Sequence, residues 1–257
     1  MDLFIAIFQG IIIASTPLVL AAVGELVVEK SGVLNLGVEG MMIIGAVTSF
    51  IVTYETGSHF LGLIAAVISA GLVASLFGLL TQYLLSNQVA TGLALTLFGL
   101  GLASLIGQTY SGISLDAFPV FDVYLLTEIP IIGSLLFNFD YLIYLSIIIV
   151  VSVYYFLNKT KLGLVLIAIG DSHDSAHSLG YPVKMVRLFA IIFGGSCAGL
   201  GGAYLSLVQT PMWVENMTAG RGWIALAIVV FAVWRPLWIL VGAYIFGGIT
   251  IIQLHVQ

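Results

Sequence analysis

Long apolar stretches, separated by short polar breaks, run through the whole chain. One of the eight stretches, residues 224–234, is apolar but too short to cross a bilayer, which suits a half-helix or a re-entrant segment. The other seven are near the length of about 20 residues that a bilayer-spanning helix needs. These seven are residues 3–23, 38–53, 61–85, 89–108, 141–157, 186–208 and 237–254. The pattern predicts an all-α, polytopic membrane helical bundle of about seven spans.

The composition agrees with a protein that lies in a bilayer. Charged residues make up 7% of the 257 and hydrophobic residues 61%, with a mean hydropathy of +1.19. Soluble domains carry about 25% charged residues, so this chain has too few polar side chains to cover a globule in water. A single cysteine, Cys197, excludes intrachain disulfides and cysteine clusters for metals. No basic patch indicates nucleic acid. We expect one transmembrane domain over residues 1–257, with no cofactor and no metal.

The positions of lysine and arginine predict the orientation. Four of the seven basic residues, Lys159, Lys161, Lys184 and Arg187, lie within or beside one loop, residues 158–185. Basic loops stay in the cytoplasm. The loop at residues 109–140 has acidic residues but no lysine or arginine, so we expect it on the extracytoplasmic side. Counting the spans back from the basic loop places the N-terminus outside as well.

The first polar interruption follows the first span. An ionisable group in such a place is costly unless it is paired, wetted or lining a pathway. Glu25 and Glu29 are four residues apart and share a helix face, and we expect the same of Asn35 and Glu39, with glycines loosening the backbone between them. A broken helix exposes backbone groups that can bind a polar solute. The alternative is that Glu25, Glu29 and Lys30 only mark the membrane boundary.

The second interruption precedes the short apolar segment. Arg221 stands between two glycines, with Trp223 after it and Glu215 before it. An Arg–Glu pair beside aromatic rings could orient a planar polar solute, because guanidinium groups and aromatic faces both favour flat partners. The alternative is an interfacial anchor, in which Trp213 joins the aromatic belt and Arg221 extends to the headgroups.

The order of elements repeats. A span, a polar interruption and an apolar segment occur in residues 3–53 and again in residues 186–234, once starting outside and once inside, as in an inverted repeat. Within the second copy, Gly195, Gly199 and Ala203 recur at helical spacing. Small residues let helix backbones approach closely in lipid, so we expect this span in the centre of the bundle.

The basic loop contains a short polar helix. Ser172 suits its N-cap, and Gly180 with Pro182 ends it. His173 and His177 are four residues apart, but no third ligand accompanies them, so a metal site is not expected.

Two runs of residues resemble one family. The sequence ELVVEKSGVLNLGVEGMM at residues 25–42 and MTAGRGWIALA at residues 217–227 are similar to the permease subunits of ABC importers for nucleosides and simple sugars, within the group that includes ribose and branched-chain amino-acid permeases. Residues 170–181 resemble the segment that docks on the ATPase. The chain keeps the family's residues at Gly170, Ala176 and Gly180 but departs from them at Asp171 and Ser172, among others.

The resemblance implies a permease domain that moves nucleosides or related sugars into the cytoplasm across the plasma (inner) membrane. It is a transport subunit and not an enzyme, and ATP hydrolysis is expected on a separate subunit. The implied partners are an ABC ATPase subunit, a second homologous permease subunit, an extracytoplasmic solute-binding protein and a small polar solute. The solute pathway would use Asn35, Glu39, Glu215, Arg221 and Trp223. Coupling to the ATPase would use Gly170, Asp171, Ser172, Ala176 and Gly180.

Other interpretations remain open at this stage. An ion-coupled secondary transporter could use Glu25, Glu29 or Glu39 as a proton or sodium site, and a non-transporting membrane scaffold would have a similar composition. No nucleophile–base pair or metal cluster indicates an enzyme. Members of the family usually continue past the equivalent of Gln257 with a further span, so the resemblance also predicts a clipped C-terminus.

Overall fold

The computed structural model describes residues 2–120 and 139–256, and within them the chain is a bundle of helices. Seven of these helices are long and apolar enough to cross a membrane, which confirms the predicted number of spans. They are α1 (Asp2–Lys30), α2 (Val38–Thr56), α3 (His59–Gly78), α4 (Gln88–Gly107), α7 (Tyr141–Lys159), α10 (Val183–Tyr204) and α12 (Pro236–Val256). Three shorter helices are α8 (Lys161–Asp171), α9 (His173–Ser178) and α11 (Arg221–Phe231), of which α11 is the predicted half-helix.

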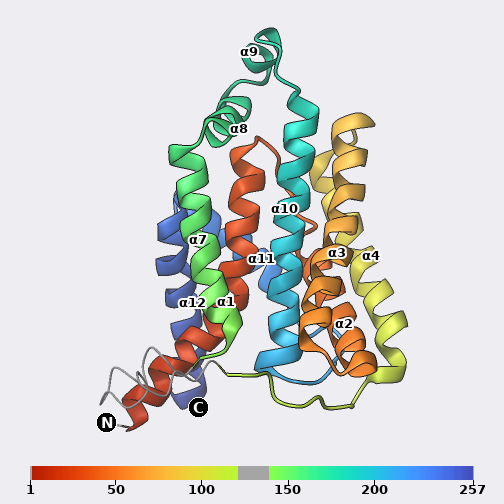
Figure 1. Cartoon of the computed structure of the whole chain (residues 1–257), viewed down its shortest axis with the longest axis vertical. Helices are drawn as coiled ribbons and strands as arrows, with labels where there is room; N and C mark the ends of the chain where they lie inside the picture. Colours follow the sequence, from red (N-terminus) through yellow and green to blue (C-terminus); the bar gives the residue numbers. More distant parts are fainter. Residues whose placement is uncertain (1, 121–138, 257) are drawn as a thin grey trace.

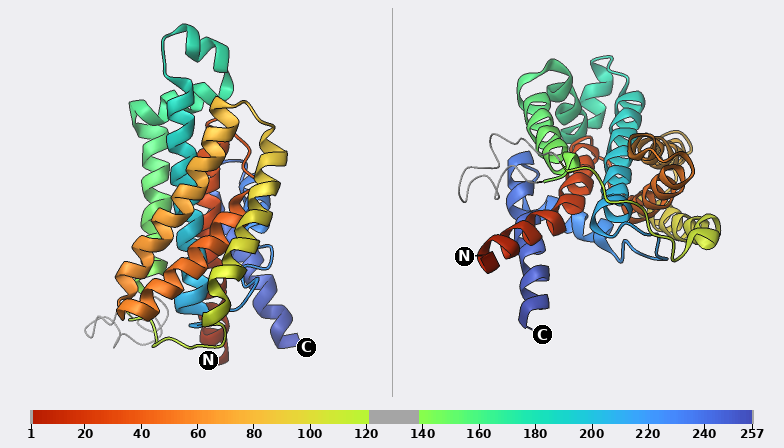
Figure 2. Two further views of the ribbon diagram at one scale, coloured as in Figure 1. Left: turned by 90° about the vertical axis from the view of Figure 1, so that its right-hand side faces the viewer. Right: turned by 60° about the horizontal axis from the view of Figure 1, so that its bottom comes forward.

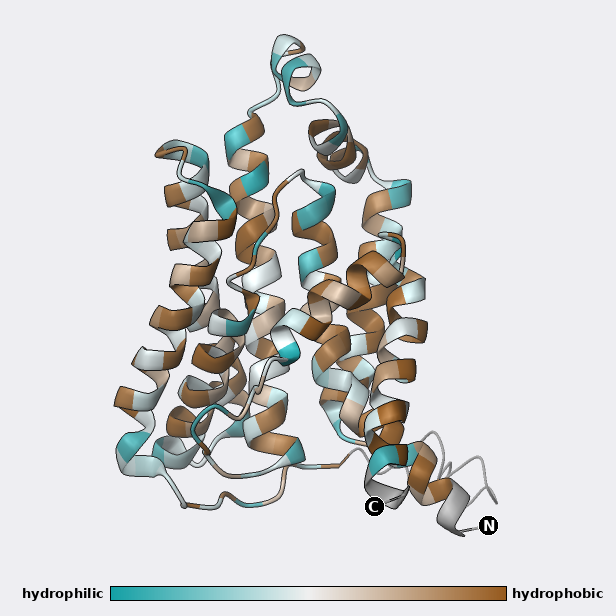
Figure 3. Ribbon diagram, turned by 180° about the vertical axis from the view of Figure 1, so that it is seen from behind, coloured by the Kyte–Doolittle hydropathy of each residue, from teal (hydrophilic) through white to brown (hydrophobic). Residues whose placement is uncertain are grey.

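Short turns of other helix types extend three of the spans. They are η1 (Leu79–Tyr83) after α3, η2 (Gln108–Tyr110) after α4 and η3 (Leu205–Gln209) after α10. Apolar residues cover most of the length of the bundle, and hydrophilic residues gather towards its ends and on α9 (Figure 3). This distribution is the one that a bilayer around the middle of the bundle requires.

The loops lie at opposite ends of the bundle. Helices α8 and α9 stand at one end, and the outer ends of α1 and α12 lie at the other, together with the start of the loop that follows α4 (Figure 1). Of the predicted loop at residues 109–140, positions 121–138 lie outside the described residues. The basic loop and the described parts of the acidic loop are thus on opposite sides, and the assignment of the basic side to the cytoplasm stays a prediction.

Helices α1 and α10 pack against each other in the centre of the bundle, with α3 and α4 on one side and α7 and α12 on the other (Figure 2). Their contact depends on small residues: a Cβ added to Gly24 would lie 2.7 Å from the carbonyl oxygen of Gly194. A Cβ on Gly199 would likewise lie 2.5 Å from the carbonyl oxygen of Ala66, on α3. The predicted central position of this glycine-rich span is confirmed.

The first interruption differs from the prediction in two respects. Helix α1 continues to Lys30, past the predicted end of the span at residue 23, so that Glu25 and Glu29 share a helix as expected and only residues 31–37 interrupt it. Asn35 lies in this non-helical segment and does not share a helix face with Glu39, which is on the first turn of α2. The reason is that Gly32 adopts a left-handed conformation, with φ +82°, and turns the chain back on itself.

The span α2 and the half-helix α11 run in opposite directions from a common point. Helix α2 starts beside the start of α11, where Glu39 contacts Gly222, and it ends where Glu55 accepts a hydrogen bond from Tyr110 at 2.8 Å. Helix α11 leads to the opposite end, where Trp234 contacts Glu29. This is the order of elements expected of an inverted repeat.

Candidate functional site at the meeting of α2 and α11

The carboxylate of Glu39 caps the N-terminus of α11. Only 2% of Glu39 is exposed. Its Oε1 accepts hydrogen bonds from the Thr218 hydroxyl at 2.6 Å and from the Gly220 amide at 2.8 Å, and its Oε2 accepts one from the Gly222 amide at 2.6 Å. The first amides of a helix lack partners within the helix and lie at the positive end of its dipole. A buried carboxylate is therefore stabilised here although it lies inside an apolar bundle.

Glycines make this approach of α2 and α11 possible. Gly220 has φ +83°, a conformation that other residues rarely adopt. A Cβ on Gly222 would lie 2.6 Å from the backbone nitrogen of Glu39, so any side chain there would separate α2 from α11. In the Gly-Arg-Gly run, the amides of the two glycines bind Glu39, whereas the sequence had drawn attention to the Arg221 side chain.

Asn35 shapes the segment that returns from the end of α1 to the start of α2. Its side-chain Oδ1 accepts a hydrogen bond from the Gly37 amide at 2.9 Å. Its backbone amide donates to Oε1 of Glu25 at 3.1 Å. Both Asn35 and Glu25 are buried. The other oxygen of Glu25, Oε2, is buried without a hydrogen-bond partner among the described residues. Glu25 and Asn35 together hold the non-helical backbone in place.

Helix α4 supports the other side of this return segment, and sequence reasoning missed it. Gln88 Oε1 accepts from the Leu34 amide at 3.0 Å, and the Thr96 hydroxyl donates to the Leu36 carbonyl at 3.0 Å. Gly92 and Gly99 let the backbones meet, since a Cβ on either would lie within 3.0 Å of backbone atoms of the segment or of Gly40. The spacing of Gly92, Thr96 and Gly99 on one helix face was the available indication.

The structure does not bring Arg221 and Glu215 together as a pair among the described contacts. Arg221 is half-buried, and its Nη1 donates to the Met217 carbonyl at 2.8 Å. Glu215 accepts from the Ser104 hydroxyl at 2.7 Å and lines a hollow of about 490 Å³ beside α4. Each side chain therefore has a partner of its own.

The two tryptophans of this region have different surroundings. Trp223, on the first turn of α11, is 46% exposed, so its ring is available to a partner. Trp213 is 1% exposed and buried against α4, where a Cβ on Gly107 would overlap its ring. The alternative of Trp213 as an anchor in the aromatic belt is therefore wrong.

A hydrogen bond joins α1 to the turn between α11 and α12. The indole of Trp234 donates a hydrogen bond to the Glu29 carboxylate. Val233 and Trp234 both have positive φ, at 50° and 51°. A β-branched residue in this region is strained, so the contacts of the turn hold it in place. Arg187 on α10 also donates to the Ser31 carbonyl, at 2.9 Å.

The residues predicted for ATPase coupling lie together at the far end of the bundle. Gly170 lies against the Lys30 carbonyl, with no room for a side chain, and Ala176 is buried at 4% exposure. Gly180, with φ +84°, follows α9. Asp171 and Ser172 are exposed. Helix α9 confirms the predicted short polar helix.

Comparison with known proteins identifies the family. A family model described as the branched-chain amino acid transport system / permease component matches residues 7–256. The chain belongs to this permease family. It is therefore a multi-pass transport protein of the plasma membrane.

Relatives share most of the chain. The permease is 43% identical over 249 residues to a putative glucose ABC transporter permease of Haloferax volcanii, a match that covers 95% of this chain and 75% of the relative. It is 29% identical to a nucleoside ABC transporter permease of Lactococcus lactis, covering 95% of this chain and 80% of the relative. It is also 29% identical to a guanosine ABC transporter permease of Bacillus subtilis, covering 94% and 79%. No solved structure matches the chain.

Proposed function

We propose that the permease imports nucleosides or related sugars as one transmembrane subunit of an ATP-driven transporter. The relatives named for glucose, nucleoside and guanosine transport support both classes of cargo. Both classes are small, polar and ring-bearing. They require hydrogen-bonding groups and a flat apolar surface within the membrane, and the meeting point of α2 and α11 offers both.

The observation that carries the proposal is the contact of Glu39 with the start of α11. It fixes two broken helices inside an apolar bundle, and broken helices of this kind form solute sites in membrane transporters. Beside this contact, the exposed ring of Trp223 can stack on a sugar or a base. Arg221 lies two residues before Trp223 in the sequence, on the same first turn of α11. Asn35 and Glu39 hold the backbone of the pathway, and Glu215 lies in the polar hollow beside α4.

The proposed partners fit the two ends of the bundle. An ATPase subunit would dock on α9 and on the exposed residues Asp171 and Ser172. A solute-binding protein would dock at the opposite end, and a second homologous permease would complete the pathway. Closure of the ATPase dimer on ATP would push α9 and move the spans between outward and inward access.

Transport by the reconstituted complex tests the proposal. The permease, purified with its native partners, is placed in liposomes, and uptake of radiolabelled guanosine and glucose is measured with and without ATP on the ATPase side. We expect uptake of at least one of them that requires ATP and survives an ionophore. Uptake that ignores ATP and collapses with a proton or sodium gradient would instead establish the ion-coupled alternative. A scaffold would give no uptake at all.

A further inference from the structure

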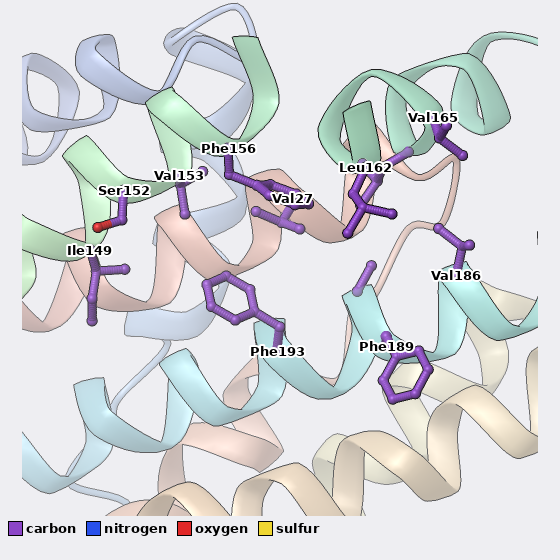
Figure 4. Close-up of a pocket in the computed structure, with 12 residues that line it drawn as sticks. Val27, Ile149, Ser152, Val153, Phe156, Leu162, Val165, Val186, Phe189 and Phe193 are labelled. Atoms are coloured by element: carbon purple, nitrogen blue, oxygen red, sulfur yellow. The ribbon is translucent and has the colours of Figure 1, made fainter. Parts of the chain in front are cut away.

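An apolar cavity opens on a part of the bundle to which neither α2 nor α11 contributes a lining residue. It has a volume of about 500 Å³ and lies between α1, α7, α8 and α10 (Figure 4). Eleven of its twelve lining residues are apolar, and the exception is Ser152. A site for a sugar or a nucleoside needs several placed polar groups. This cavity is therefore built for a hydrocarbon and not for the cargo.

The cavity is open to the surroundings of the bundle and not sealed within it. Of the residues that line it, Leu162 is 73% exposed, Phe189 65% and Phe193 38%. These side chains stand on the outer faces of α8 and α10, next to α7, a membrane span. An exposed apolar hollow on a helix bundle in a bilayer is in contact with lipid chains.

Two lysines stand at the rim of the cavity at the end nearest α8. Lys159 is three residues after the lining residue Phe156 and so lies one turn further along the same face of α7. Lys161 is four residues before the lining residue Val165 and so lies one turn before it on the same face of α8. Both lysines are exposed. Basic residues next to a membrane attract anionic headgroups, so an apolar cavity with a basic rim matches both parts of an anionic lipid.

We propose that the cavity binds a hydrocarbon chain of an anionic phospholipid, whose phosphate contacts Lys159 and Lys161. The bound chain fills the space under α8 and joins this helix to α1, α7 and α10. The lipid site does not depend on which cargo the permease carries, nor on which side of the membrane α8 faces.

Photolabelling of the complete transporter tests the site. The complex is reconstituted in phosphatidylcholine bilayers that contain phosphatidylglycerol with a diazirine in its hydrocarbon chain, and the labelled residues are mapped by mass spectrometry. We expect labels concentrated on residues that line the cavity, above all Phe189 and Phe193. Labelled phosphatidylcholine at the same concentration should give much weaker labelling there.

Variants separate the chain site from the headgroup site. Ser152→Phe places a ring in the cavity and should abolish its labelling, whereas Val151→Phe, at the preceding position of α7, which does not line the cavity, should leave labelling unchanged. Lys159→Gln and Lys161→Gln should each lower the preference for phosphatidylglycerol by about fivefold. The control is Lys184→Gln, because Lys184 lies over the ring of Tyr83, 5.6 Å from its centroid.

Three outcomes would overturn the proposal. Labels spread evenly over the outer faces of the helices would show that the cavity has no special affinity. Equal labelling by the two lipids, or a preference that survives both lysine variants, would show that the rim does not select an anionic headgroup. No labelling of the cavity in the complete transporter, with labelling elsewhere, would show that another subunit covers it.

Discussion

Glu39 and Gly222 are 183 residues apart in the sequence, and the Glu39 carboxylate accepts a hydrogen bond from the Gly222 backbone amide at 2.6 Å. Glu39→Ala would leave the buried amide of Gly222 and the partly buried amide of Gly220 without this acceptor. Each unsatisfied buried donor costs about 1–3 kcal/mol, so we expect a loss of about 2–4 kcal/mol in stability and a loss of uptake. Thermal unfolding of the purified complex and uptake in liposomes measure both.

The matched control is Glu55→Ala, which removes an exposed carboxylate at the other end of α2. We expect it to unfold within about 0.5 kcal/mol of the unmodified protein. Glu39→Gln should be intermediate, because its amide keeps one acceptor oxygen but turns a nitrogen towards the amides of α11. Unchanged unfolding of Glu39→Ala would contradict the role of this carboxylate.

Trp223→Ala tests the proposed contact with cargo. The ring is 46% exposed, so its removal should leave stability nearly unchanged. If a nucleobase or sugar stacks on it, uptake at low solute concentration should fall about tenfold, the equivalent of about 1.4 kcal/mol of stacking. Trp223→Phe should restore most of the uptake. Trp238→Ala, which removes a similarly exposed ring on α12, should have no such effect, and equal losses in both variants would count against a cargo contact.

Gly199→Leu tests the packing of the bundle centre. A Cβ at this position would lie 2.5 Å from both the Ala66 carbonyl oxygen and the Ala70 Cβ. Overpacking of this kind costs about 3 kcal/mol or more, so we expect a poorly assembled protein on size-exclusion chromatography. Gly10→Ala is the control, because its added Cβ would be in ordinary contact with Ile251, at 3.5 Å. Normal assembly of Gly199→Leu would show that α10 can move away from α3.

Asp140 predicts a pH dependence of stability. It precedes α7, accepts the Leu142 and Ile143 amides at 3.0 and 3.1 Å, and receives the Tyr204 hydroxyl at 3.1 Å. Burial raises the pKa of Asp140 in the folded protein. The folded state therefore binds the proton more tightly than the unfolded one, and this contribution to stability is complete below about pH 4 and falls as the pH rises through the raised pKa.

Asp140→Asn removes this titration, so the stability difference between it and the unmodified protein should change between pH 4 and pH 7. Thermal unfolding across that range measures the difference, with Asp116→Asn, an exposed residue of the same loop, as the control. A difference that stays constant with pH would refute the prediction.

Asp174→Cys tests the orientation. The native Cys197 is 3% exposed, so a membrane-impermeant maleimide should react mainly with the new cysteine on α9. We expect labelling in inside-out vesicles and none in intact cells. Labelling of intact cells would place the basic loop outside.

The membrane spans could be predicted because their apolar length is a local property of the sequence. The short helix α9 was likewise predicted from its own residues. Glu39 was singled out as a costly buried charge, but its partners lie in α11 and its loop, and no local pattern reveals such a distant contact. The first span was predicted to end at residue 23 for the same reason: α1 continues to Lys30 because Glu25 and Glu29 are accommodated by Asn35 and Trp234, from other parts of the chain.

The end of α1 is held from two sides. Arg187, near the start of α10, donates to the Ser31 carbonyl, and Trp234, at the turn after α11, donates to Glu29. A turn of four residues, 179–182, joins α9 to α10. Because both contacts are made at the same end of α1, a displacement of α10 would also strain the turn after α11, which gives the proposed coupling a route from one face of the membrane to the helix whose start binds Glu39.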